Sequence, residues 1–248
     1  MPVIDVNGVW KTYHNHARLG IKERLVGRRV SAERGRFARN WALQDVSFTI
    51  EAGRSLGVVG HNGTGKSTLL SLILGTIEQD RGEIRRKGNI GGMLALGAGC
   101  HPDLTGRENI YLNGSILGLR LAEIRQKFDS IVDFSELESA IDLPLRTYSS
   151  GMSARLAFSV LAHAHRDVML IDEVLAVGDA SFQAKCATYF ADYQAQGGTL
   201  IVVSHDLISL QELCAEGIWL HEGKVVHQGP IAATIECYRK FIVETIGA

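Results

Sequence analysis

The feature that most constrains the fold is a glycine-rich octapeptide, Gly60-His-Asn-Gly-Thr-Gly-Lys-Ser67, which lies between an apolar run and an amphipathic one. Residues 55–59 are predicted to form a buried strand, and the apolar positions 69, 70, 73 and 74 follow a helical period within 66–74. Glycines allow backbone N–H groups to turn toward phosphate oxygens, and a helix N-terminus adds a favourable dipole. The strand, the turn and the helix together predict a phosphate-binding loop.

The residue types within this loop predict separate roles. Lys66 is expected to reach the β- and γ-phosphates of a nucleotide, and Ser67 to ligate Mg²⁺. The expected nucleotide contacts are Gly60, His61, Asn62, Gly63, Thr64, Gly65, Lys66, Ser67 and Thr68. The simpler alternative is an ordinary glycine-rich turn, which the match to the whole GxxxxGK[ST] pattern in its proper context disfavours.

A pair of acidic residues, Asp172 and Glu173, follows the apolar run 168–171. A buried strand that ends in acids can deliver one carboxylate to a metal ion, and a neighbouring carboxylate can activate water for attack on a γ-phosphate. We assign Asp172 to the metal and Glu173 to the catalytic base. Many strands end in acidic residues, so this pattern indicates a catalytic site only in combination with the phosphate-binding loop.

The order of the predicted elements indicates an α/β protein with a largely parallel sheet. Strands are expected at 46–50, 55–59, 168–171 and 199–203, a hairpin at 218–227, and helices at 66–74, 107–134, 151–165, 181–195, 206–213 and 231–245. With 46% hydrophobic residues in 248, the chain can bury a real core. We see neither a signal peptide nor an apolar run long enough to span a membrane.

Tyr148-Ser-Ser-Gly-Met152, just before a predicted helix, resembles the LSGGQ signature of ABC-type ATPases. Its simple alternative is a helix cap in which Ser150 precedes a helix beginning at Gly151. The resemblance implies a P-loop NTPase (RecA-like) core with antiparallel β elements and an inserted helical subdomain. It also implies that Ser150, Gly151 and Met152 bind the nucleotide held by a second copy of the chain.

Other residues resemble further elements of that family. Tyr13 resembles the aromatic residue that stacks on adenine, His205 the switch histidine that contacts the γ-phosphate, and Asp179 the acid of the D-loop. One departure is clear, because Leu96 and Ala95 stand where many members carry the Q-loop glutamine. We assign no residue to that role.

Several passages are similar to one branch, the ATP-binding subunits of bacterial polysaccharide exporters for O-antigen, capsule or teichoic acid. They are Trp41-Ala-Leu43, 96–102, 104–114, 148–152 and 173–179. The resemblance implies a homodimeric ATPase, with ATP and Mg²⁺, that lies peripherally on the cytoplasmic face of the inner membrane. Its expected partner is an integral-membrane permease that exports a lipid-linked glycan. Some members continue into a C-terminal carbohydrate-binding domain, for which these 248 residues leave no room.

The expected organisation is one ABC ATPase domain over 1–248. A nucleotide-binding core is assigned to 1–94 and 163–229, a helical and signature subdomain to 95–162, and a C-terminal helix to 230–248. Residues 14–40 form a basic insertion with eight Lys or Arg against two Glu, although the whole chain has a net charge of −1. This insertion is either a solvated loop or a contact for lipid headgroups or a substrate pyrophosphate.

Three alternatives remain beside the exporter subunit. An ATPase of another transporter or a soluble ABC-type ATPase would share the same motifs, although the soluble ones usually carry two cassettes or a long coiled coil. A GTP-dependent switch would need an N-K-x-D motif, which is absent. A non-enzymatic binding module would predict a broken phosphate loop or no Glu173. The balanced overall charge disfavours nucleic acid as a partner.

Overall fold

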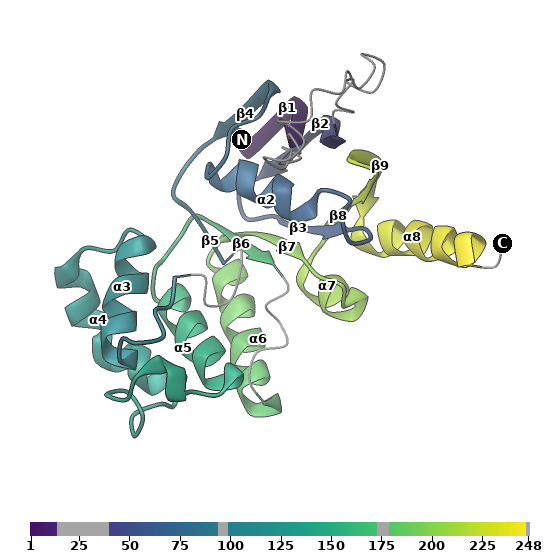
Figure 1. Ribbon diagram of the computed structural model, residues 1–248. Helices are drawn as coiled ribbons and strands as arrows, with labels where there is room; N and C mark the ends of the chain where they lie inside the picture. Colours follow the sequence, from purple (N-terminus) through teal and green to yellow (C-terminus); the bar gives the residue numbers. More distant parts are fainter. Residues whose placement is uncertain (14–39, 94–98, 173–178, 247–248) are drawn as a thin grey trace, which may run out of the picture.

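The computed structural model describes residues 1–13, 40–93, 99–172 and 179–246, and its described strands form two sheets (Figure 1). The smaller sheet is antiparallel and has the strand order β2-β1-β4. Its strands are Pro2–Tyr13 (β1), Asn40–Glu51 (β2) and Arg81–Arg86 (β4). Ile4, Val6 and Val9 of β1 are buried, as expected for a sheet that packs one face on a core.

The larger sheet has six strands in the order β5-β6-β7-β3-β8-β9. In this order, β5, β6, β7, β3 and β8 run parallel to one another, and β9 pairs antiparallel with β8. They are Ser55–Val59 (β3), Ile90–Met93 (β5), Val168–Asp172 (β6), Thr199–Val203 (β7), Glu216–His221 (β8) and Lys224–Pro230 (β9). Because β3, β6 and β7 are parallel neighbours, the residues that follow their carboxyl ends gather at one edge of the sheet.

Helices cover both faces of this larger sheet. The described helices are Lys66–Leu74 (α2), Gly106–Ile116 (α3), Leu121–Ser135 (α4), Ser150–Ala162 (α5), Ala180–Ala195 (α6), Leu207–Leu213 (α7) and Ile231–Ile246 (α8), with a short 3₁₀ turn at Leu145–Thr147. Figure 1 shows α2 between the two sheets, and α5, α6 and α7 on the opposite side of the larger sheet. Helix α8 extends away from the body at one end (Figure 1).

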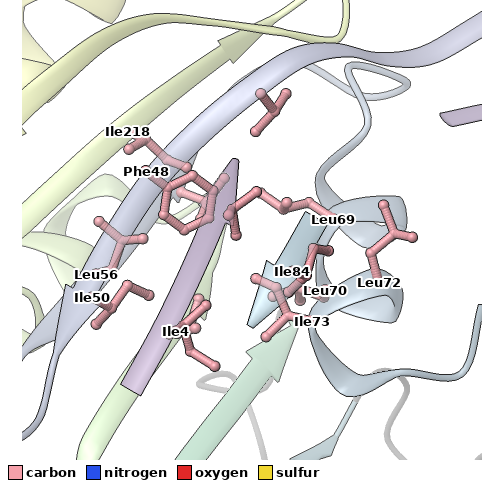
Figure 2. Packing of buried hydrophobic residues seen from close by; sticks show 14 of the residues in the cluster. Ile4, Phe48, Ile50, Leu56, Leu69, Leu70, Leu72, Ile73, Ile84 and Ile218 are labelled. Atoms are coloured by element: carbon pink, nitrogen blue, oxygen red, sulfur yellow. The ribbon is translucent and has the colours of Figure 1, made fainter. Parts of the chain in front are cut away.

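The alternating residues of the central strands divide the core into two clusters. Val168 and Leu170 of β6 belong to the first cluster, which fills the space between the two sheets and α2. Figure 2 shows part of it, with Phe48 of β2 and Leu69 of α2. Met169 of β6 belongs instead to the second cluster, under α5 to α8. Each fully buried aliphatic side chain contributes about 1.5–3 kcal/mol to stability.

A third cluster lies within the region of α3, α4 and α5 and is built mainly from aliphatic residues. Ile110 of α3, Ile124 of α4 and Leu156 of α5 are fully buried in it. The far side of α5 contributes Phe158 and Leu161 to the second cluster. Helix α5 therefore packs against the helical region and the strand core at once.

The structure corrects some of the predicted elements. Residues 107–134 form two helices rather than one, because Gly118 has a left-handed φ of 79° and Arg120 caps a new helix with Glu123. Helix α5 begins at Ser150, so its N-cap is Ser149 and not Ser150. Strands β1, β4 and β5 were not predicted, whereas the helix at 66–74 and the strands at 55–59 and 199–203 are confirmed.

Two further predictions concern membranes and the basic insertion. No described helix is both long and apolar enough to cross a bilayer. Most of the basic insertion, residues 14–39, lies outside the described residues, between the end of β1 and the start of β2.

Candidate functional site

The glycine-rich loop connects β3 to α2 and is pressed between two neighbouring strands. Gly60 and Gly65 have positive φ angles of 155° and 103°. A Cβ atom on Gly60 would overlap the carbonyl oxygen of Leu220 in β8, and one on Gly65 would overlap the carbonyl oxygen of Ala42 in β2. Only glycine allows both the backbone conformation and this close approach.

Lys66 is the first residue of α2, and its side chain returns over the loop. Only 6% of the residue is exposed. Its Nζ donates hydrogen bonds to the carbonyl oxygens of Gly60 at 2.6 Å and His61 at 2.9 Å. The Thr64 hydroxyl donates to the same His61 carbonyl at 2.9 Å. The ammonium group is therefore held at the centre of the loop, where it can neutralise phosphate charge.

Ser67 and Asp172 come from different parts of the chain and meet at this edge of the sheet. The Ser67 hydroxyl donates to Oδ2 of Asp172 at 3.1 Å. A hydroxyl and a carboxylate are both oxygen donors, which Mg²⁺ prefers, so the two residues fit the predicted metal site. Glu173, the predicted catalytic base, lies outside the described residues, as do Ala95 and Leu96.

A pocket of about 400 Å³ opens beside the loop. It is lined by Tyr13, Trp41, Ala42, Asn62, Gly63, Gly65, Lys66, Ser67, Thr68 and Asp172. Tyr13 is half exposed, and its hydroxyl lies 3.4 Å from Oγ1 of Thr68. Gly60, His61 and Thr64 shape the loop but do not line this pocket, and the His61 ring instead packs edge-on to Tyr238 of α8 at 5.6 Å.

Sequence reasoning assigned no role to Trp41 and Ala42, which also line the pocket. The sequence signal for these two residues is weak, because Trp41-Ala-Leu43 indicates only a resemblance to the exporter branch and no contact with a nucleotide. The place of Ala42 depends on the contact between its carbonyl group and Gly65, which the sequence does not display.

The predicted signature residues form the first turn of α5. The Ser149 hydroxyl caps this helix by accepting a hydrogen bond from the Met152 N–H at 3.2 Å. Ser150 is exposed, whereas Gly151 and Met152 are partly buried. None of these residues is among the described residues that line the pocket. Within one copy of the chain, the exposed N-terminus of α5 thus does not contribute to the pocket beside the phosphate loop.

Asp179 caps α6 and is linked to the same helix α5. Its Oδ1 accepts a hydrogen bond from the Phe182 N–H at 3.0 Å, and its Oδ2 pairs with Arg155 of α5 at 2.7 Å. The Phe182 N–H, with a further contribution from Arg155, lowers the pKa of this carboxyl group. Arg155 also pairs with Glu136 at 3.2 Å. The acid is therefore charged and fixed relative to the signature turn.

His205 lies just after β7 and is exposed. The neighbouring Asp206 caps α7 by accepting a hydrogen bond from the Ile208 N–H at 3.0 Å, and its own N–H donates to Ser204 Oγ at 3.0 Å. Because β7 lies between β3 and β6, His205 stands at the same sheet edge as the phosphate loop and Asp172. It is not among the described residues lining the pocket.

Comparison with known proteins identifies the class. Residues 43–176 match the family model described as ABC transporter, and the chain belongs to that family. It is 42% identical to the O-antigen export system ATP-binding protein RfbB of Klebsiella pneumoniae over 241 residues, which cover 96% of this chain and 98% of that protein. It is 43% identical to the teichoic acids export ATP-binding protein TagH of Lactococcus lactis, over 82% of this chain and 43% of that protein.

Solved structures with the same fold confirm the predicted P-loop α/β class. The dimeric structure of a post-hydrolysis state of an ATP-binding cassette bound to ADP and Pi has a TM-score of 0.72 and 21% identity, over 92% of this chain and 98% of that one. The structure of an ATP-binding subunit of an ABC transporter has a TM-score of 0.72 and 20% identity, over 96% of this chain and 93% of that one.

Proposed function

We propose that this chain is the ATP-hydrolysing subunit that powers export of a lipid-linked polysaccharide across the cytoplasmic membrane through a partner permease. The observation that carries the proposal is the pocket in which Lys66, Ser67 and Asp172 meet. The relatives support the proposed class of cargo, because the similarity to an O-antigen export ATP-binding protein extends over 96% of the chain.

Within one copy, the proposed chemistry is positioning and electrostatics. Lys66 neutralises charge on the β- and γ-phosphates, and Ser67 and Asp172 hold Mg²⁺. When bound, the metal would supply positive charge to the phosphate oxygens. Glu173 accepts a proton from the attacking water, and His205 contacts the γ-phosphate. Hydrolysis of ATP to ADP and phosphate supplies the free energy for transport.

A second copy completes the proposed site. In a head-to-tail homodimer, Ser150, Gly151 and Met152 of one copy close over the nucleotide held by the other, and Asp179 communicates between the two sites. The exposed N-terminus of α5 supports this arrangement, because unpaired helix N–H groups attract phosphate. The ion pair between Arg155 and Asp179 couples both elements within each copy.

The segment 97–109 is proposed to face the permease, with His101, Pro102 and Leu104 as candidates for the contact. His101, Pro102 and Asp103 are exposed there, and Arg146 pairs with Asp103 at 3.0 Å. Such a docked subunit would lie peripherally on the cytoplasmic face of the membrane, with the lipid-linked glycan reaching it only through the permease.

The proposal is tested first on the purified subunit. Glu173→Gln should still bind ATP but hydrolyse it about 10²–10⁴ times more slowly, because only the general base is removed. It should also accumulate as an ATP-bound dimer in size-exclusion chromatography. Lys66→Ala is the matched control and should weaken binding itself. Near-normal turnover by Glu173→Gln would refute the assignment of the base.

The cargo is tested in cells. A strain lacking this subunit should retain the lipid-linked glycan on the cytoplasmic side, and the wild-type chain should restore export while Glu173→Gln does not. An ATPase of another transporter, the second candidate, would leave glycan export unchanged in that strain. A soluble ABC-type ATPase would in addition fail to co-purify with a membrane permease.

A further inference from the structure

The pocket beside the phosphate loop has an aromatic wall that the proposed roles leave partly unexplained. Its polar lining includes Asn62, Lys66, Ser67, Thr68 and Asp172, which suit phosphates and a metal ion. Tyr13 and Trp41 supply the aromatic part of the lining, with Ala42 beside them. The aromatic side of the pocket is therefore the part left for the base of the nucleotide.

Trp41 of β2 is held in place by two neighbours, Trp10 of β1 and Arg81 of β4. Its ring contacts the Trp10 ring edge-to-face, with centroids 5.0 Å apart. The Arg81 guanidinium lies 5.7 Å from the Trp41 ring and 5.9 Å from the Trp10 ring, within the range of cation–π attraction. A tryptophan fixed in this way has already lost the rotamer freedom that ligand binding would otherwise cost.

The backbone around Trp41 is fixed as well. Trp41 pairs with Thr12 across the ladder of β1 and β2. The N–H and the hydroxyl of Thr12 both donate to the Asp80 carboxylate, at 2.6 and 2.7 Å, just before Arg81 begins β4. These bonds fasten the ends of β1 and β4 together beside the aromatic group.

The same strand also reaches the phosphate loop. The carbonyl oxygen of Ala42, one residue after Trp41, lies so close to Gly65 that a Cβ there would overlap it. The indole is thus one residue from the backbone that touches the loop. A ligand whose phosphates occupy the loop will place its base within reach of this wall.

We propose that Trp41 stacks against the nucleobase, so that the base site uses two aromatic residues, Trp41 and Tyr13. This inference rests on the proposed function. Stacking is tolerant of base identity because every base has a π face. Trp41 should therefore add affinity for nucleotides as a class rather than select adenine, and Arg81 acts on it as a positioning residue.

The test compares ADP with pyrophosphate, which keeps the phosphates and lacks the base, by titration calorimetry with Mg²⁺ present. Trp41→Ala should weaken ADP binding about 5- to 150-fold, the usual range for a lost stacking ring, and leave pyrophosphate binding unchanged. Trp41→Phe should retain most of the ADP affinity. Arg81→Gln should weaken ADP binding less than Trp41→Ala does.

Tryptophan fluorescence gives a second readout. ADP should quench the wild-type protein and Trp219→Phe alike, since Trp219 packs against α8 and is not among the described pocket residues, whereas Trp41→Phe should lose this quenching. Unchanged ADP affinity in Trp41→Ala, or equal losses for ADP and pyrophosphate, would overturn the stacking role. Failure of the proposed function would look different, because a strain lacking the subunit would then export glycan normally, whatever the affinity of Trp41→Ala for ADP.

Discussion

Replacing Asn109 by alanine should destabilise the subunit strongly, although this residue lies outside the nucleotide pocket. Asn109 is fully buried on α3 and organises the segment 99–105. Its Oδ1 accepts a hydrogen bond from the His101 N–H at 2.7 Å. Its Nδ2 lies within 2.9–3.1 Å of three carbonyl oxygens, those of His101, Leu104 and Thr105.

The magnitude follows from these partners. Each hydrogen bond contributes about 1 kcal/mol net, and a buried donor left without a partner costs about 1–3 kcal/mol. The amide makes at least three such bonds at once, since one N–H can be shared between two carbonyls. We therefore expect Asn109→Ala to lower the free energy of unfolding by about 3–4 kcal/mol, a large part of the total of about 5–15 kcal/mol typical for a domain.

The Asn109→Asp variant tests the donors alone, because it keeps the side-chain oxygen acceptor and removes the amide N–H donors. The carboxylate can still accept from His101, but it faces three carbonyl oxygens, so its pKa in the folded state should rise above the unfolded value of about 3.9. The protonated form can donate again. Stability relative to Asn109→Ala should therefore be gained at pH 4 and lost as the pH rises through the folded pKa.

Urea unfolding of the three proteins at pH 4 to 8 measures this directly. A loss below about 0.5 kcal/mol for Asn109→Ala would show that water replaces the amide without cost. A constant difference between the aspartate and alanine variants over this pH range would refute the donor argument. As a functional check, cysteine crosslinks from position 102 to the permease should weaken in Asn109→Ala.

The remaining predictions concern the loop and the thiols. Gly60→Ala should abolish nucleotide binding and lower the thermal midpoint more than Gly63→Ala does. A Cβ at Gly63 meets open space and costs only left-handed backbone strain of about 1–2 kcal/mol. If calorimetry gave the two variants the same thermal midpoint and nucleotide affinity, the close approach of Gly60 to Leu220 would be contradicted. Burial raises the pKa of the Cys186 and Cys214 thiols to about 12, so these two should react with a thiol reagent at pH 8 only after unfolding. Prompt labelling of either one in the native protein would contradict their burial.

The phosphate loop was predictable because its function resides in the backbone, and the sequence of glycines encodes that backbone directly. Strand β4 was not predictable for the opposite reason. It carries Arg-Gly-Glu-Ile-Arg-Arg, of which only Ile84 is buried, and it is held by main-chain pairing with β1. A strand that buries one side chain leaves no alternating pattern to detect.

The candidate site likewise contains parts that the sequence predicts and parts that it does not. The meeting of Ser67 and Asp172 followed from parallel strand order, which the alternation of strands and helices already indicated. The place of Trp41 depends on contacts with Trp10 and Arg81, which join three strands, and no local pattern encodes them. The N-cap of α5 was misplaced by one residue because consecutive serines, Ser149 and Ser150, are equally good caps.

The wedging of the phosphate loop between the carbonyl oxygens of Leu220 and Ala42 has a kinetic consequence. A loop whose shape is imposed by two neighbouring strands does not have to fold around its ligand, so little chain entropy is lost when a phosphate arrives. Nucleotide association with the subunit should then follow a single phase, with a rate that rises linearly with nucleotide concentration, and differences in affinity between nucleotides should reside in their dissociation rates.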